Sequence, residues 1–180
     1  MAEAIENYTP QIALKGIKRQ AIFAWSIGFV LIFAWVAVIL FAPIAAENNW
    51  TGISAPIYKF FGFLCHQMPS RSFFIHDHQL AVCSRCFGIY FGLLVGFIVY
   101  FFIRDIEETE PIPRFWLFLS LIPIGVDWSL TAFGIWENTF FSRFLTGLIL
   151  GVTCAIFIIP ALVELGHLLS KKSKRKRLSN

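Results

Sequence analysis

The sequence predicts an all-α integral membrane protein with four transmembrane helices and a short interfacial or re-entrant helix after the first. Hydrophobic residues make up 57% of the 180 residues and charged residues only 14%, whereas about a quarter of the residues of a soluble domain are charged. Several apolar segments reach the roughly 20 residues that a helix needs to cross the hydrocarbon core of a bilayer. The chain has the length of one small domain.

The first apolar segment, 21–46, follows a polar N-terminal segment, 1–20, that mixes acidic and basic residues. It is uncharged and longer than a transmembrane helix requires. A secretory signal peptide is the alternative, because basic residues precede the segment and small residues end it. The apolar region of a signal peptide spans only about 7 to 15 residues, so we expect a transmembrane helix with a cytoplasmic segment before it.

A long connection, 47–81, precedes the second span and holds most of the reactive side chains. Its apolar piece, 56–64, is too short to cross a bilayer and suits an interfacial or re-entrant helix. The second span is expected at 82–103, where glycine recurs at every fourth position from Gly88 to Gly96. Such a row lets another helix approach closely.

The third and fourth spans are expected at 115–135 and 143–165, after a charged loop that contains two prolines. The tail 170–180 carries six positive charges between Lys171 and Arg177. The positive-inside rule places this tail in the cytoplasm, and an even number of spans places the N-terminus there too. We therefore expect a multi-pass domain, 21–169, in the inner or plasma membrane, with the tail contacting anionic lipids of the bilayer rather than nucleic acid.

This orientation places a group of cysteines and histidines at the outer face of the membrane. Cys83 and Cys86 lie three residues apart, on the helix face opposite to the glycine row and near a first turn that favours thiolates. With Cys65 and His66 they form a three-cysteine, one-histidine set, a common arrangement for zinc. Because adjacent Cys65 and His66 cannot easily bind one ion together, His78 is an alternative ligand for zinc or another divalent metal.

Two other interpretations of the cysteines remain open beside the metal site. Cys83 and Cys86 could form a redox dithiol or a disulfide on the oxidising outer side, passing electrons to a quinone or to Cys65. Alternatively, a structural zinc ion or disulfide could hold the long loop onto the helices of a non-enzymatic membrane subunit. Cys154, in the fourth span, is expected to be a small core residue.

An aspartate and three arginines form a second polar group at the same face. Asp127 lies inside the third span, about eight residues from its outer end, and needs a partner there. Arg143 is the predicted partner, and Arg71 and Arg85 add positive charge. Their planar guanidinium groups suit a phosphate or carboxylate of a lipid or lipid-linked substrate, so these four residues are the catalytic candidates.

Each of these assignments has a simpler alternative. The aspartate and its arginine could form a purely structural ion pair, and the other arginines could reach lipid phosphates without selectivity. The sequence contains no glycine-rich phosphate loop, no serine–histidine–aspartate order and no HExxH motif, so it indicates no reaction class. Whether the protein is an enzyme therefore stays open at this point.

A distinctive pattern extends over about residues 57 to 151. It consists of Cys65-His66-Gln67, Arg71-Ser72-Phe73, Cys83-x-Arg85-Cys86-x-Gly88-x-Tyr90-x-Gly92, Asp127 and Arg143-x-x-Thr146-Gly147. This pattern resembles a family of small prokaryotic integral membrane proteins that share a domain of unknown function. The resemblance implies a multi-span membrane domain with a shared set of cysteine, histidine and arginine residues. It implies no substrate.

Overall fold

The computed structural model describes residues 11–106, 108 and 112–178, and the side chains of 11–15 and 169–178 lie outside this description. Along the chain it contains α2 (Gln11–Glu47), α3 (Thr51–Gly62), the 3-10 helix η1 (Pro69–Arg71), β1 (Phe74–Ile75), β2 (His78–Gln79), α4 (Ser84–Ile103), α5 (Phe115–Ala132) and α6 (Phe140–Leu178). Four helices of the described chain are long and apolar enough to cross a membrane: Gly16–Glu47, Ser84–Ile103, Phe115–Ala132 and Phe140–Leu168. The predicted fold class is confirmed, including the short helix after the first span.

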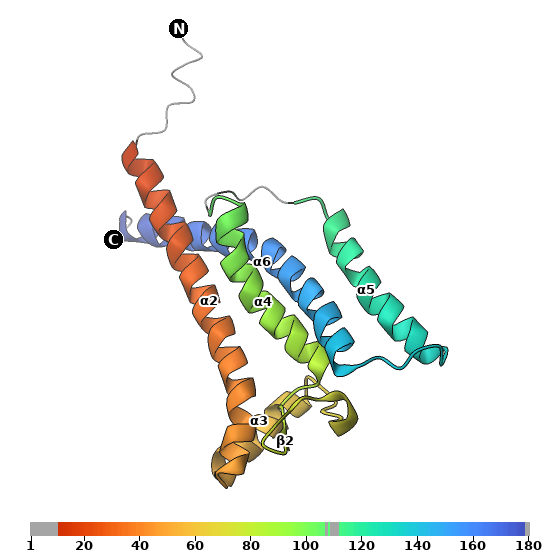
Figure 1. Cartoon of the computed structure of the whole chain (residues 1–180). Helices are drawn as coiled ribbons and strands as arrows, with labels where there is room; N and C mark the ends of the chain where they lie inside the picture. Colours follow the sequence, from red (N-terminus) through yellow and green to blue (C-terminus); the bar gives the residue numbers. More distant parts are fainter. Residues whose placement is uncertain (1–10, 107, 109–111, 179–180) are drawn as a thin grey trace.

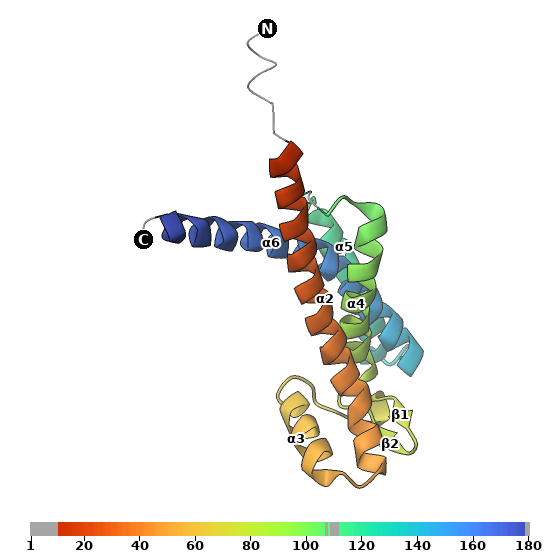
Figure 2. The ribbon, with the colours of Figure 1, turned by 90° about the vertical axis from the view of Figure 1, so that its left-hand side faces the viewer.

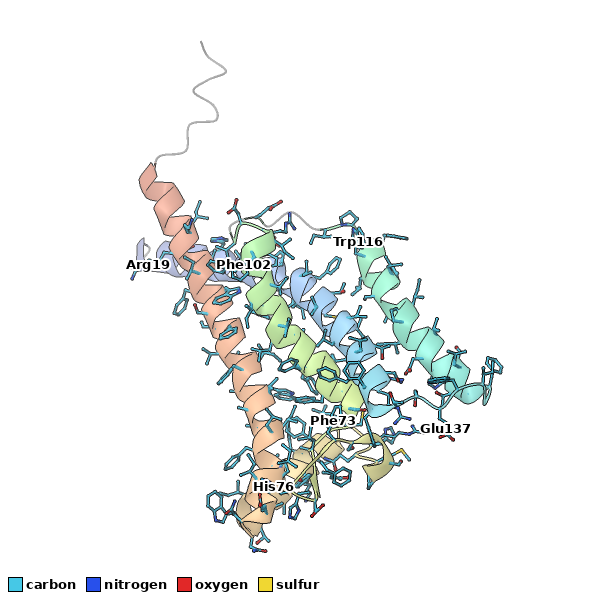
Figure 3. All side chains as sticks on the ribbon, viewed as in Figure 1. Arg19, Phe73, His76, Phe102, Trp116 and Glu137 are labelled. Carbon is cyan, nitrogen blue, oxygen red and sulfur yellow. The ribbon has the colours of Figure 1, made fainter. Side chains whose placement is uncertain are left out.

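The four long helices stand beside one another, each running opposite to the one before it (Figure 1). Consequently the end of α2, the start of α4, the end of α5 and the start of α6 come together at one end of the bundle, which we call the cysteine end. The short elements α3, η1, β1 and β2 also lie there. Figure 3 marks the cysteine end with Phe73, His76 and Glu137, and the opposite end with Arg19, Phe102 and Trp116.

The helix bounds differ from the prediction at several places, including the short helix, which was expected at 56–64 and is found at Thr51–Gly62. α2 begins at Gln11, so the second half of the polar segment before the first span is helical; residues 1–10 lie outside the described part of the chain. α5 ends at Ala132, and α6 continues to Leu178 through the basic tail. Lysine and arginine are good helix formers, and no glycine or proline follows Gly166 to stop the helix. α6 contains Pro160 and changes direction along its length (Figure 2).

The glycine row of α4 packs directly against a second glycine pair on α6. A Cβ atom on Gly88 would overlap the carbonyl oxygen of Phe144, and a Cβ atom on Gly151 would overlap that of Ile89. The two helix backbones are therefore in direct contact, as the spacing of the glycines predicted. We call this contact, made by Gly88 and Gly92 of α4 with Gly147 and Gly151 of α6, the glycine seam.

Because one face of α4 packs on α6 at the seam, the opposite face points toward α2 and α3. Near the cysteine end, Cys83, Cys86 and Tyr90 pack against a buried cluster that comes from α2, α3 and the connection to α4. Its buried members are Ile39, Ala42, Phe61, Cys65, Ala81 and Val82. As the sequence predicted, one face of α4 packs on a helix while the opposite face carries the two cysteines.

Helix α5 is attached much more loosely. It contacts α6 but makes few contacts with α4, and most of its apolar side chains are exposed, including Phe118, Ile122 and Val126. Ser120 is its buried residue. A helix that is apolar on nearly all sides suits lipid tails rather than water, and α5 packs on the bundle mainly through its contact with α6.

Candidate functional site

Three thiols that lie far apart in the sequence meet at the cysteine end. Cys65 follows α3, Cys83 is the N-cap of α4, and Cys86 lies in the first turn of that helix. Their Sγ atoms all lie within 4.8 Å of one another. The backbone N–H of Cys83 donates a hydrogen bond to Sγ of Cys65, with an N–S distance of 3.2 Å. The loop and the start of α4 thus deliver one compact group of sulfur atoms.

The arrangement of the three sulfur atoms fits a soft divalent metal. Thiolate ligands of tetrahedral zinc lie about 2.3 Å from the ion and hence about 3.8 Å from one another, within the spread of these Sγ atoms. Hydrogen bonds from the Cys83 and Cys86 thiols and from the Cys83 backbone lower the pKa of Cys65, although burial opposes this effect. The deprotonated thiolate is the form of cysteine that binds metal.

The loop that carries Cys65 is held in place by Gln67, which has a left-handed backbone with φ of 47°. Its Nε2 donates to the carbonyl oxygens of Tyr58 at 2.8 Å and Ala81 at 2.7 Å. The hydroxyl of Tyr58 in turn donates to the carbonyl oxygen of Gln79 at 2.6 Å, and burial raises the pKa of this tyrosine. Gln67 belongs to the Cys65-His66-Gln67 motif, but its residue type and position did not predict this role.

The two histidines that were predicted as ligands lie outside the thiol group. His66 is exposed beside Cys65, and His78 is half-buried on β2. The described residues that gather as potential metal ligands here are Cys65, Cys83 and Cys86. Cys154 lies apart from them, half-buried on α6. A histidine as the fourth ligand therefore stays a prediction.

The pair His76-Asp77 forms the turn of a small hairpin that the sequence did not reveal. Strands β1 and β2 pair in antiparallel fashion, with Phe74 opposite Gln79. Both turn residues have positive φ angles, 45° and 62°, as a two-residue type I′ turn requires. Nδ1 of His76 lies 2.6 Å from a carboxylate oxygen of Glu47, at the end of α2. The hairpin is thereby tied to the first long helix.

The predicted direct pair of Asp127 and Arg143 is wrong. Asp127 on α5 forms its ion pair with Arg85 on α4. Its Oδ2 also accepts a hydrogen bond from Nδ2 of Asn138 at 3.0 Å, and Oδ1 of Asn138 accepts one from Nε of Arg143 at 2.6 Å. Arg143 thus reaches the aspartate through Asn138. α5 ends only five residues after Asp127, which allows the connection to fold back over it.

A cavity of about 370 Å³ joins the thiols to this polar network. Arg71, Arg85 and Arg143 all line it, so the three predicted arginines do converge. The remaining lining residues are Cys83, Cys86, Ile89, Trp128, Thr131, Ala132 and Asn138. Two cysteines and three arginines therefore line one space between η1, α4, α5 and α6.

Only part of the positive charge around this cavity is balanced within the described chain. Arg85 is paired with Asp127, whose side chain is 9% exposed. Arg71 has no carboxylate partner among the described residues, and Arg143 bonds a neutral amide. The carbonyl oxygen of Arg71 accepts a hydrogen bond from Oγ of Ser84 at 3.0 Å. That bond holds η1 against the start of α4, which keeps Arg71 at the cavity.

Comparisons with known proteins identify relatives. Over 119 residues, 66% of this chain and 76% of the relative, the chain is 43% identical to an uncharacterized protein of Methanocaldococcus jannaschii. Over 96 residues, 53% of this chain and 85% of the relative, it is 35% identical to an uncharacterized protein of Methanothermobacter thermautotrophicus. No solved structure matches. Residues 65–157, which include the thiols and the arginines, match the family described as "Predicted membrane protein (DUF2085)". The chain therefore belongs to this family of predicted membrane proteins, as the resemblance implied.

Proposed function

We propose that this protein holds a divalent metal ion, zinc in the first place, on the thiolates of Cys65, Cys83 and Cys86, and acts there on an anionic group of a lipid or lipid-linked substrate. The observation that carries the proposal is the convergence of three Sγ atoms within 4.8 Å. Three thiolates are a soft ligand set that selects zinc over magnesium or calcium. When bound, zinc supplies a Lewis acid that polarises an oxygen atom.

The cavity supports a reactive rather than a purely structural site. Structural zinc ions in proteins are closed by four protein ligands, whereas catalytic ones keep an open position. Three cysteines gather in the described structure, and two of them line a cavity that also contains three arginines. The chain's own part in the reaction is then to bind and orient a negative group beside the thiols.

The membrane orientation belongs to the same proposal. The basic segment Lys171–Arg177 favours the cytoplasm for the end of α6, and the cysteine end lies at the opposite end of the membrane-spanning helices (Figure 1). We therefore assign the cysteine end to the outer face and both termini to the cytoplasm. Labelling of single introduced cysteines with a membrane-impermeant reagent, in a variant that lacks the native thiols but still folds, tests this orientation.

The experiment for the metal measures elemental content of the purified full-length protein by mass spectrometry. We expect about one metal ion per chain in the wild type and loss of that ion in Cys83→Ser and Cys65→Ser. Cys154→Ser is the matched control, because its thiol lies outside the group, and it should keep the metal. Metal that persists in Cys83→Ser, or is equally low in Cys154→Ser, would contradict the proposal.

A thiol oxidoreductase is the second candidate, since the same short distances suit a dithiol. In that case Cys83 and Cys86 would exchange two electrons and two protons with a quinone or with another disulfide. Counting of free thiols by mass-tagged alkylation separates the two functions. A metal-free protein in which two cysteines react only after reduction would favour redox chemistry.

A further inference from the structure

We propose that the cavity beside the thiols binds a phosphate group, held by Arg71 and Arg143, with Arg85 fixed behind them by Asp127. This inference deepens the proposed function by naming the substrate class, and it rests on that function only for the claim that the bound group is acted upon. Binding itself follows from the arginines. We expect the phosphate to belong to a membrane lipid or lipid-linked molecule.

The first argument is charge. The cavity is lined by three guanidinium groups, and one carboxylate, that of Asp127, is bonded to one of them. This leaves an excess of two positive charges, and a zinc ion on three thiolates would reduce the excess by one. Without a bound anion, the cavity would hold like charges beside one another, and an anion would relieve their repulsion.

The second argument is the set of hydrogen-bond donors. Arg143 uses its Nε for Asn138, which leaves its terminal nitrogens for a ligand. The side chain of Arg71 makes no hydrogen bond within the described part of the chain, and Nε of Arg85 is buried without a partner there. The donors available to a ligand therefore come from Arg71 on η1 and Arg143 on α6, because the Arg85 atom is inaccessible. The three terminal oxygens of a phosphate monoester can satisfy more of them than the two oxygens of a carboxylate.

The third argument is the position of the cavity at the ends of the long helices. Ile89 and Ala132 give it an apolar side, and Trp128, another lining residue, is 62% exposed. A tryptophan at the end of a membrane helix suits the level of the lipid head groups. A phosphate at this depth can remain attached to an apolar chain that lies along the exposed apolar side of α5.

The arrangement assigns different tasks to the arginines. Arg71 and Arg143 are the binding groups, because neither is neutralised by a described carboxylate. Arg85 is a positioning residue, since its ion pair with Asp127 joins α4 to α5 and keeps the cavity wall in place. Replacement of Arg71 or Arg143 by lysine should keep the charge but lose the planar, two-pronged contact.

The test measures ligand binding to the full-length, metal-loaded protein in detergent by native mass spectrometry. The probes are phosphatidic acid, oleate and inorganic phosphate, titrated separately. We expect one phosphatidic acid per chain, bound at least tenfold more tightly than oleate. Arg71→Gln and Arg143→Gln should each weaken this binding about 10- to 100-fold, as loss of hydrogen bonds to a charged group implies, and the lysine variants should fall between.

Arg114→Gln is the matched control, because Arg114 is an exposed arginine at the far end of α5, and its binding should equal that of the wild type. If Arg143→Gln fails to fold, Arg71→Gln carries the test, since the Arg71 side chain makes no bond in the described structure. Unchanged phosphatidic acid binding in Arg71→Gln, or oleate binding as tight as that of phosphatidic acid, would overturn the proposal. Inorganic phosphate that binds as tightly as the lipid would support the phosphate site and identify a soluble source.

Metal content measured on the same samples separates this inference from the proposed function. Phosphatidic acid binding that depends on the arginines in a protein without metal would sink the metal site and leave the phosphate site standing. One metal ion per chain, together with lipid binding that is unchanged in Arg71→Gln and Arg143→Gln, would support the metal site and overturn the phosphate site.

Discussion

The glycine seam and the attachment of α5 hold neighbouring helices together in different ways. At the seam, α4 and α6 approach until a Cβ atom on Gly88 or Gly151 would overlap the backbone of the other helix. By contrast, α5 is joined through Asp127, which bonds Arg85 and Asn138. The first contact is made almost without side chains, and the second is made by side-chain charges.

This difference between the two contacts explains why the cavity lies beside α5 and not at the seam. Lipid tails are as apolar as leucine, so helices in a bilayer associate through close packing or through polar contacts. Close packing at the glycine seam leaves no space, whereas long polar side chains hold α5 at a distance and leave room between the helices. We call the contact of Asp127 with Arg85 and Asn138 the polar joint. Arg85 and Asn138 both line the cavity. Close packing and the cavity are thus found at different helix pairs.

The largest effect is expected at the seam. Gly151→Ala should lower the free energy of unfolding by about 3 kcal/mol or more, because the new Cβ atom meets the backbone at Ile89 rather than a flexible side chain. For a chain of this size the Tm should fall by roughly 6–12 °C. Thermal unfolding in detergent measures the change. Gly125→Ala on α5 is the control, because no atom lies within 4 Å of its Cβ position; an equal fall in both variants would remove the contrast between the helices.

An intermediate effect is expected for the polar joint. Asp127→Ala leaves Arg85 and Asn138 without their shared acceptor, and we expect a loss of about 2 kcal/mol. Hydrogen exchange should increase in α5 before it increases in α4 or α6. Glu137→Ala, an exposed change in the connection between α5 and α6 (Figure 3), is the matched control. Uniform faster exchange over all helices would show that α5 is not separately attached.

The smallest effect is expected where a polar side-chain contact lies at the surface. His76→Ala removes the contact with Glu47, but these side chains are 69% and 42% exposed, compared with 24% and 9% for Arg85 and Asp127. Exposed pairs contribute only about 0–1 kcal/mol, so the Tm should change by no more than a few degrees. If the Tm fell as much as in Asp127→Ala, burial would not explain why the Arg85–Asp127 contact is stronger than the His76–Glu47 contact.

Residue types and spacing predicted the parts of the fold that are local to one helix. Apolar length predicted the four long helices, and the four-residue spacing predicted a packing face that holds Gly88 and an opposite face that holds Cys83. The gathering of Cys65 with the other two thiols also agrees with the sequence, because unusual residues at a membrane surface seldom occur together without a shared site.

The partner of Asp127 could not be predicted, because it depends on how α4 and α5 are aligned across 42 residues of chain. Arg143 was nearer in the sequence, but a loop asparagine, Asn138, stands between them. The hairpin was missed for a local reason: its strands have two residues each, and His76-Asp77 lacks the glycine that usually signals such a turn. An asparagine placed between an intramembrane acid and an arginine is the signal that could have identified the bridge.

The glycine seam also has a consequence for motion. Two helices whose backbones interlock cannot slide or rotate past one another without a steric clash, so α4 and α6 form a rigid frame that carries two of the three thiols. The cavity can then widen only through its other walls, α5 and η1, and helix movements of this kind typically take microseconds to milliseconds. A shift of α5 away from α4 would have to break the bond between Arg85 and Asp127.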